Sequence, residues 1–318
     1  MPKASSFMLE VTNKDSSVRQ HLPASYPILE LLLWKGSSLM KIGKDRTTSL
    51  HLAAESGYTG LMELLLGNPP SNPAALKGHT GVIELLFGRG EIEALDKDKN
   101  TALHLAAQGG HTAIVDLLLG NGASIDSLDK DMRTALHLST WKGHTATVDL
   151  LLGKGASVEA LDVYECTAMH FAVLMGHAAI VDLLLRKGAL PNTQHNTDTA
   201  LHVAARQGHT AVVDLLLRKG VSPHTWDSSS NTALHVSAWH GHTPIVDLLL
   251  GKGAASPNAM SYDRRTPLHD AASRGHTGVV KLLLEKGASR EAENEAGMTA
   301  LQMARSGEYW DSVRLLET

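Results

Sequence analysis

The stretch that decides the fold is TALHLAAQGGHTAIVDLLLG, residues 101–120. Each half places apolar residues at the three- and four-residue spacing of an amphipathic helix. Gly110 lies between the halves, where a glycine ends a helix and permits a tight turn. Thr101 is suited to the N-cap of the first helix, because its hydroxyl accepts a hydrogen bond from an otherwise unpaired backbone N–H. The stretch therefore predicts two short helices joined by a turn.

The same stretch recurs along the chain at a nearly constant spacing. Its copies begin at Thr101, Thr134, Thr167, Thr199, Thr232, Thr266 and Thr299, which are 33, 33, 32, 33, 34 and 33 residues apart. A further copy begins at Thr48. One helix pair cannot bury its apolar face alone, so the copies are expected to stack and form one elongated core.

This pattern resembles that of the ankyrin repeat family, and the resemblance covers nearly the whole chain. It implies an all-α solenoid of helix-turn-helix units, each with a β-turn finger. In that family the histidines of Thr-x-Leu-His and Gly-His tie fingers to helices, which accounts for fourteen of the 18 histidines. The family's finger has a glycine where this chain has Lys99, Met132, Glu165, Ser230 and Arg264. These fingers are expected either to be looser or to use another turn, whereas Gly297 conforms.

Departures from the repeat suggest how the chain is divided. Residues 1–15 are expected to be a flexible N-terminus, and residues 16–66 a degenerate unit followed by one repeat. Residues 67–77 form a Pro-rich break in a truncated repeat, because three prolines replace its first helix. The break is either a hinge or, as we favour, a distortion in a continuous stack. Residues 78–318 are expected to be a continuous array that ends in a polar capping repeat.

Composition excludes several classes of protein. The 29 Lys and Arg nearly balance the 33 Asp and Glu, which argues against a nucleic-acid surface or a polybasic membrane anchor. No apolar run reaches the roughly 18 residues that a membrane span requires. Cys166 is the only cysteine, which excludes a disulfide framework and fits a reducing compartment. We expect a cytoplasmic protein, with entry into the nucleus also open.

Catalytic motifs are missing from the sequence, which lacks a Walker A loop, HExxH and Gly-x-Ser-x-Gly. The enzyme hypothesis rests on Cys166, which lacks an organised base, or on His240, which stands near His235 and His242. No carboxylate or cysteine completes a metal site around these histidines. We therefore expect a protein without catalytic activity, cofactor or metal.

The ankyrin resemblance also implies a modification. Asn192 and Asn258 occupy the finger position at which ankyrin proteins can be hydroxylated by an asparaginyl hydroxylase.

Residues that the repeat does not dictate point to a binding surface. In the resembled family, fingers and the ends of the first helices line a concave groove. Residues at those positions that are predicted to contact a partner protein are Trp141, Lys142, Tyr164, Leu174, Met175, Arg206, Trp239 and His240. Exposed aromatic residues are typical of binding hot spots, although these rings can instead pack on the neighbouring repeat.

The sequence thus predicts a scaffold for protein–protein interaction that binds no nucleic acid and no small-molecule substrate. The alternative is a regulatory inhibitor or a substrate-recruiting adaptor subunit of a signalling or degradation complex.

Overall fold

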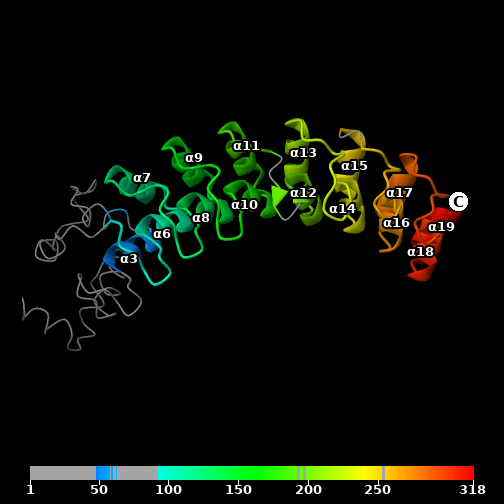
Figure 1. The fold of residues 1–318 in the computed structure, drawn as a ribbon, viewed down its shortest axis with the longest axis horizontal. Coiled ribbons are helices and arrows are strands. Elements are labelled where there is room, and N and C mark those ends of the chain that lie inside the picture. The colour runs from blue at the N-terminus through cyan, green and yellow to red at the C-terminus, as the bar shows by residue number, and fades with distance from the viewer. Residues whose placement is uncertain are drawn as a thin grey trace, which may run out of the picture.

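The computed structural model describes residues 48–57, 59, 62, 92–191, 194, 195, 198–252 and 255–318. The expectations for the N-terminus, for the degenerate first unit and for the break at residues 67–77 lie outside this part of the chain. Within it, the chain forms a curved array of helix pairs, with one helix of each pair along the concave side of the arc and the other along the convex side (Figure 1). The predicted all-α solenoid is confirmed.

Each repeat contributes an inner helix on the concave side and an outer helix on the convex side. The inner helices are α3 (Ser49–Ser56), α6 (Ala102–Gly109), α8 (Ala135–Trp141), α10 (Ala168–Leu174), α12 (Ala200–Gln207), α14 (Ala233–Trp239), α16 (Pro267–Ala272) and α18 (Ala300–Ser306). The outer helices are α7 (Thr112–Gly120), α9 (Thr145–Gly153), α11 (Ala178–Arg186), α13 (Thr210–Arg218), α15 (Thr243–Gly251), α17 (Thr277–Glu285) and α19 (Trp310–Glu317). Two short strands in one finger, β1 (Gln194–His195) and β2 (Asp198–Thr199), pair antiparallel.

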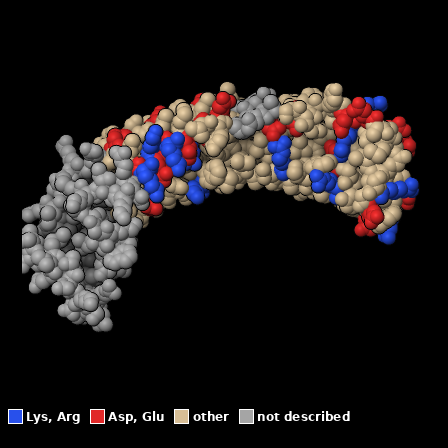
Figure 2. All heavy atoms as spheres, turned by 60° about the horizontal axis from the view of Figure 1, so that its bottom comes forward, with Lys and Arg blue, Asp and Glu red and all other residues tan. Residues whose placement is uncertain are grey.

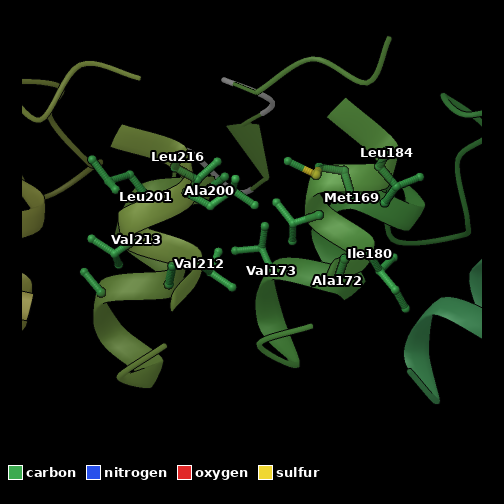
Figure 3. Close-up of a cluster of buried hydrophobic side chains, with 14 of the residues drawn as sticks. Met169, Ala172, Val173, Ile180, Leu184, Ala200, Leu201, Val212, Val213 and Leu216 are labelled. Carbon is green, nitrogen blue, oxygen red and sulfur yellow. The ribbon is translucent and has the colours of Figure 1, made fainter. Parts of the chain in front are cut away.

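The core is a thin layer that runs the length of the described array. Figure 3 shows one section of it, in which side chains of two neighbouring helix pairs meet. Its labelled residues are Met169, Ala172, Val173, Ile180, Leu184, Ala200, Leu201, Val212, Val213 and Leu216, all buried. Small alanines let the inner helices approach closely, which explains how few aromatic residues this core needs.

The histidine that follows the helix-capping threonine ties an inner helix to the finger of the next repeat. The structure shows this link at His51, His104, His137, His202, His235 and His269. In one copy the backbone N–H of Thr101 donates to Nδ1 of His104, at 3.1 Å. Because Nδ1 accepts, the ring proton resides on Nε2, which donates to the carbonyl of Arg133 at 3.0 Å. The same link joins His235 to the carbonyl of Arg265, at 3.1 Å. The ring is therefore buried with both nitrogens satisfied, in the neutral form.

The histidine of Gly-His makes a second link, to the preceding repeat. His144 Nε2 lies 2.9 Å from the carbonyl of Gln108, at the end of the inner helix before it. His209 bonds the carbonyl of Leu174 in the same way, also at 2.9 Å. In the last repeat Tyr309 replaces this histidine and packs against Gly275. The end of an inner helix is thus held in place by a hydrogen bond from the following repeat.

The fingers keep one turn even where glycine is missing. Lys99, Met132, Glu165, Ser230 and Arg264 adopt φ values between 56° and 61°, the same left-handed region as Gly297 at 72°. The expectation that they use another turn is therefore wrong.

In most of these fingers an aspartate explains why a residue with a side chain tolerates the turn, and Ser261 takes its place in the finger of Arg264. Oδ1 of Asp96 accepts the N–H groups of Asp98 and Asn100, at 2.8 and 2.7 Å. Asn294 makes the corresponding pair of bonds in the finger of Gly297. The left-handed region is unfavourable for any residue with a Cβ, and these bonds hold the turn there nevertheless.

Glycine at a left-handed finger position should stabilise the protein. Met132→Gly relieves a backbone conformation that costs about 1 kcal/mol, partly offset by the greater freedom of glycine in the unfolded chain. We expect the free energy of unfolding to rise by a few tenths to about 1 kcal/mol in urea titrations. Gly297→Ala is the matched control and should lower it. A decrease for Met132→Gly would show that this turn carries no strain.

Acidification should destabilise the array through its buried histidines. Burial lowers the pKa of His104, His137, His202, His235 and His269, in the case of His235 to about 4. The unfolded chain then binds protons first as pH falls below about 6.5. The free energy of unfolding is therefore highest above that pH and falls toward pH 4. His235 alone should account for a decrease of about 3 kcal/mol.

The measurement is urea unfolding between pH 7.5 and pH 4.5, comparing the native chain with His235→Gln. Gln302 stands at the equivalent position of the last repeat, where its Oε1 accepts the Thr299 N–H at 2.8 Å. His235→Gln should therefore keep the helix cap. Its free energy of unfolding at pH 7.5 should be about 1 kcal/mol lower than that of the native chain, because the bond to the finger is missing, and it should fall less as the pH is lowered. His224→Gln, on an exposed finger residue, is the control. Equal acid sensitivity of His235→Gln and the native chain would contradict the explanation.

Candidate partner-binding surface

The ends of the inner helices lie in one row along the concave side. Trp141, Leu174, Arg206 and Trp239 occupy equivalent positions in successive repeats. Each backbone carbonyl of this row accepts from the Gly-His histidine of the next repeat, at 2.9 to 3.4 Å. Seen from the underside of the arc, an uncharged stretch lies in the middle of the array between charged groups on both sides (Figure 2). The predicted site residues are thus presented on a backbone that the framework holds.

Five of the eight predicted residues lie in the first half of this row or, like Tyr164, on the finger beside it. Four of them, which we call the apolar patch, are Trp141, Tyr164, Leu174 and Met175, with exposed fractions of 41%, 71%, 38% and 40%. Lys142, also exposed, follows the first of these at the rim.

Phe171 supports the apolar patch from below. Its ring is buried, and its centroid lies 5.2 Å from that of Trp141 and 5.8 Å from that of His137. Trp141 therefore packs on Phe171 while 41% of its surface stays exposed. Our reading of the sequence missed Phe171, because its contact with Trp141 depends on the packing of one repeat on the next.

The other three predicted residues, Arg206, Trp239 and His240, line one hollow of about 400 Å³. We call it the Trp239 pocket. Two fingers, the end of α12, one side of α14 and Asp270 of α16 line it. Its lining consists of Arg206, Asp227, Ser229, Asn231, His235, Val236, Trp239, His240, Tyr262, Asp263, Arg265 and Asp270.

Two arginines cover the ring of Trp239. The guanidinium carbon of Arg274 lies 4.0 Å from the ring centroid and that of Arg265 lies 5.2 Å from it, both within reach of cation–π attraction. Trp239 is half-buried in consequence. It packs more fully on its surroundings than Trp141 does.

A buried carboxylate lies beside this ring. Asp270 is 5% exposed, and its Oδ1 accepts from Arg265 Nε at 2.9 Å and lies 2.8 Å from Arg265 Nη2. Burial raises the pKa of Asp270 to about 7, because desolvation outweighs the attraction of Arg265 and the carboxylate of Asp263 raises it further. Sequence reasoning missed both members of this pair.

A signal for Asp270 was present in the sequence. The residue after the framework histidine is apolar in every other copy of the repeat. These residues are Leu52, Leu105, Leu138, Phe171, Val203, Val236 and Met303.

The candidate catalytic and metal-binding residues, Cys166 and the histidines around His240, do not form a reactive or metal-binding site among the residues that the structure describes. Burial raises the pKa of Cys166 to about 11, so its thiol is protonated at neutral pH, and the side chain is half-buried. His240 stacks on His242 with ring centroids 6.0 Å apart, but Nε2 of His242 is bonded to the carbonyl of Arg206, at 3.0 Å. His235 has both nitrogens bonded. No three His, Cys, Asp or Glu side chains in the described ranges are placed to hold a metal ion.

Asn258 uses its amide within the fold. Its Oδ1 accepts from the N–H of Ser289 at 2.8 Å, and its Nδ2 donates to the carbonyl of Gly287 at 3.2 Å. Asn192 lies outside the described residues. None of the helices in the part of the chain that the structure describes has the length and apolar character needed to cross a bilayer.

Replacing Asp270 by asparagine should stabilise the protein at alkaline pH. The folded-state pKa is raised, so the folded chain binds a proton more tightly than the unfolded chain, and stability falls as pH rises from about 4 through 7. Asp270→Asn removes the charge, so at pH 8 its free energy of unfolding should exceed that of the native chain by about 2 kcal/mol. At pH 5 the two should differ little. The measurement is urea unfolding at both pH values. Asp311→Asn, on an exposed carboxylate, is the control, and a destabilised Asp270→Asn at pH 8 would contradict the expectation.

Comparison with known proteins identifies the family. The sequence model of ankyrin repeats (3 copies) matches residues 71–162, 129–195, 169–261 and 254–317. Among solved structures, 504 chains match, and one similar chain is the crystal structure of the human ASB11 ankyrin repeat domain. It is 28% identical, with a TM-score of 0.63, and the match covers 69% of this chain and 99% of that one. No curated protein matches. With its repeats matched over most of its length and its helix pairs stacked as described, the chain belongs to the ankyrin repeat family.

Proposed function

We propose that this chain is a non-catalytic scaffold that binds a partner protein through the concave row of helix ends. Ankyrin repeats are generally modules of protein–protein interaction. A scaffold of this kind needs no reactive group. The protonated thiol of Cys166 and the bonded nitrogens of His235 are consistent with that role.

The observation that carries the proposal is the exposure of the apolar patch. Stacking of the repeats leaves large parts of these side chains exposed, and the core is formed by other residues. Large apolar and aromatic side chains grouped on an exposed face are typical of the centre of an interface. Trp141, supported from below by Phe171, is the anchor that we expect to contribute most to affinity.

The framework supports binding by holding the surface in advance. The carbonyls of Trp141 and Leu174 are bonded to histidines of the following repeats, at 3.4 and 2.9 Å. A surface that is ordered before binding loses less conformational entropy when the partner docks. Affinity then depends on a few anchors and not on the total area of contact.

The compartment is part of the proposal. A lone free cysteine is consistent with a reducing environment, and we propose the cytoplasm, with entry into the nucleus also open. The alternative, a regulatory inhibitor or a recruiting adaptor, differs from a scaffold in requiring one stoichiometric partner.

Affinity capture with mass spectrometry tests the proposal. Specific partners of the native chain should be lost from Trp141→Ala/Leu174→Ala/Met175→Ala, by tenfold or more, since truncation of an anchor typically costs about 2 kcal/mol or more. The matched control is Leu128→Ala/Leu161→Ala/Trp226→Ala, on finger residues that are 46–48% exposed. Circular dichroism and urea unfolding establish that both variants are folded.

Partners that bind both variants equally would refute the proposed surface. Loss of partners from the control variant alone would move the binding site to the fingers. A single partner captured in equimolar amount would favour the inhibitor or adaptor alternative.

A further inference from the structure

We infer that the Trp239 pocket binds a basic side chain, a lysine or an arginine, of the partner protein. This inference rests on the proposed function and adds to it the chemistry of one subsite. It concerns the second half of the concave row, which belongs to the two repeats that follow the apolar patch.

The first step is that the fold does not require a carboxylate at Asp270. All other copies of the repeat place an apolar residue here, as Val236 does in the repeat before. A charged group in a buried position lowers stability unless its partners compensate fully. Here the compensation is partial, because both contacts with Arg265 are made by Oδ1, while Oδ2 accepts no hydrogen bond from the residues that the structure describes. A carboxylate with spare acceptor capacity thus lines an open pocket.

The second step is the sign of the charge. The pocket lining contains two arginines and three aspartates. Both arginines are already paired, Arg265 with Asp270 and Arg206 with Asp198, just outside the lining. The carboxylates of Asp227 and Asp263 remain without an ion pair in the described chain. An anionic ligand would meet these two groups, so a cation is the favoured occupant.

The charged and titratable groups around Asp270 support the same sign. Arg206 of α12 pairs with Asp198 of β2. His235 lies in α14, and His240 follows this helix. Asp227, Asp263 and Arg265 lie in the two fingers, and Arg274 follows α16. Burial holds the pKa of both histidines below the usual range, so they are largely neutral at pH 7. Three arginines then face four aspartates.

The third step is the shape of the site. Tyr262 stands at the rim with 85% of its surface exposed, and its ring offers a face on which a guanidinium or ammonium group can stack. The hollow of about 400 Å³ is large enough for one long side chain. A basic side chain can therefore bury its aliphatic part in the hollow and place its charge near Asp263 and Asp270.

The inference has a consequence for pH. A cation prefers the ionised carboxylate, and the pKa of Asp270 is about 7. Binding should therefore release a proton from Asp270 and strengthen as pH rises from 6 to 8. An ordinary exposed carboxylate would show no change over this range.

The experiment is a carbon-13 NMR titration of the Asp270 carboxyl group in the full chain. The probe is N-acetyl-arginine amide, with N-acetyl-citrulline amide as its neutral isostere and N-acetyl-glutamate amide as an anion. We expect the arginine probe alone to shift the Asp270 resonance and to lower its pKa below 7. Asp263→Asn should weaken probe binding by about threefold, whereas Asp311→Asn should leave it unchanged.

Two results would overturn the inference. One is an Asp270 resonance that the arginine probe does not move, or moves no more than the citrulline probe does. The other is a larger effect of the glutamate probe.

Capture of a partner separates this inference from the proposed function. If the apolar-patch variant loses a partner that Asp270→Asn retains in full, the proposed surface stands and the basic subsite fails. If Asp270→Asn weakens binding of that partner at pH 8, the partner's lysines are then acetylated or its arginines replaced. The subsite is supported if these changes do not weaken binding to the variant any further. If the apolar-patch variant loses nothing, the proposed function fails whatever the arginine probe does.

Discussion

The hydrogen bond from a histidine Nε2 to a backbone carbonyl of a neighbouring repeat is the interaction on which this structure depends. It joins residues about thirty positions apart, such as His104 and Arg133, and it recurs along the described array. A backbone carbonyl is present whatever side chain stands at the acceptor position. The bond therefore survives wide variation in the exposed residues. A ring such as that of His104 is fixed as neutral, because its other nitrogen accepts a helix-cap N–H.

The second set of histidine bonds connects stability to the proposed function. The acceptors are the carbonyls of the residues that carry the candidate surface, among them Trp141, Leu174 and Trp239. The same contacts that hold one repeat on the next thus set the positions of the anchors. A change in the stacking of two repeats would move an anchor relative to its neighbours, whereas a change of the anchor side chain leaves the stacking bond intact.

The fold could be predicted from the sequence because its signal is repeated, whereas the details of the site depend on single residues. A regular spacing and two histidine positions are enough to place the helix pairs. The left-handed turn at Met132 was not predicted, because the aspartate bonds that hold it outweigh the preference for glycine. The contact of Phe171 with Trp141 was missed for another reason. It depends on packing between neighbouring repeats, and the sequence of one repeat does not specify it.

Burial acts in opposite directions on two kinds of group in the same array. It disfavours the charged form of both, which lowers the pKa of His235 and raises that of Asp270. Burying the neutral ring of His235 costs little free energy, since both ring nitrogens have hydrogen-bond partners. The aspartate differs, because one of its oxygens is left without a hydrogen bond and an apolar residue serves the fold at the same position elsewhere. The stacking of the repeats therefore accounts for the histidine but not for the aspartate, whose spare acceptor oxygen fits the basic group that we infer enters the pocket from outside.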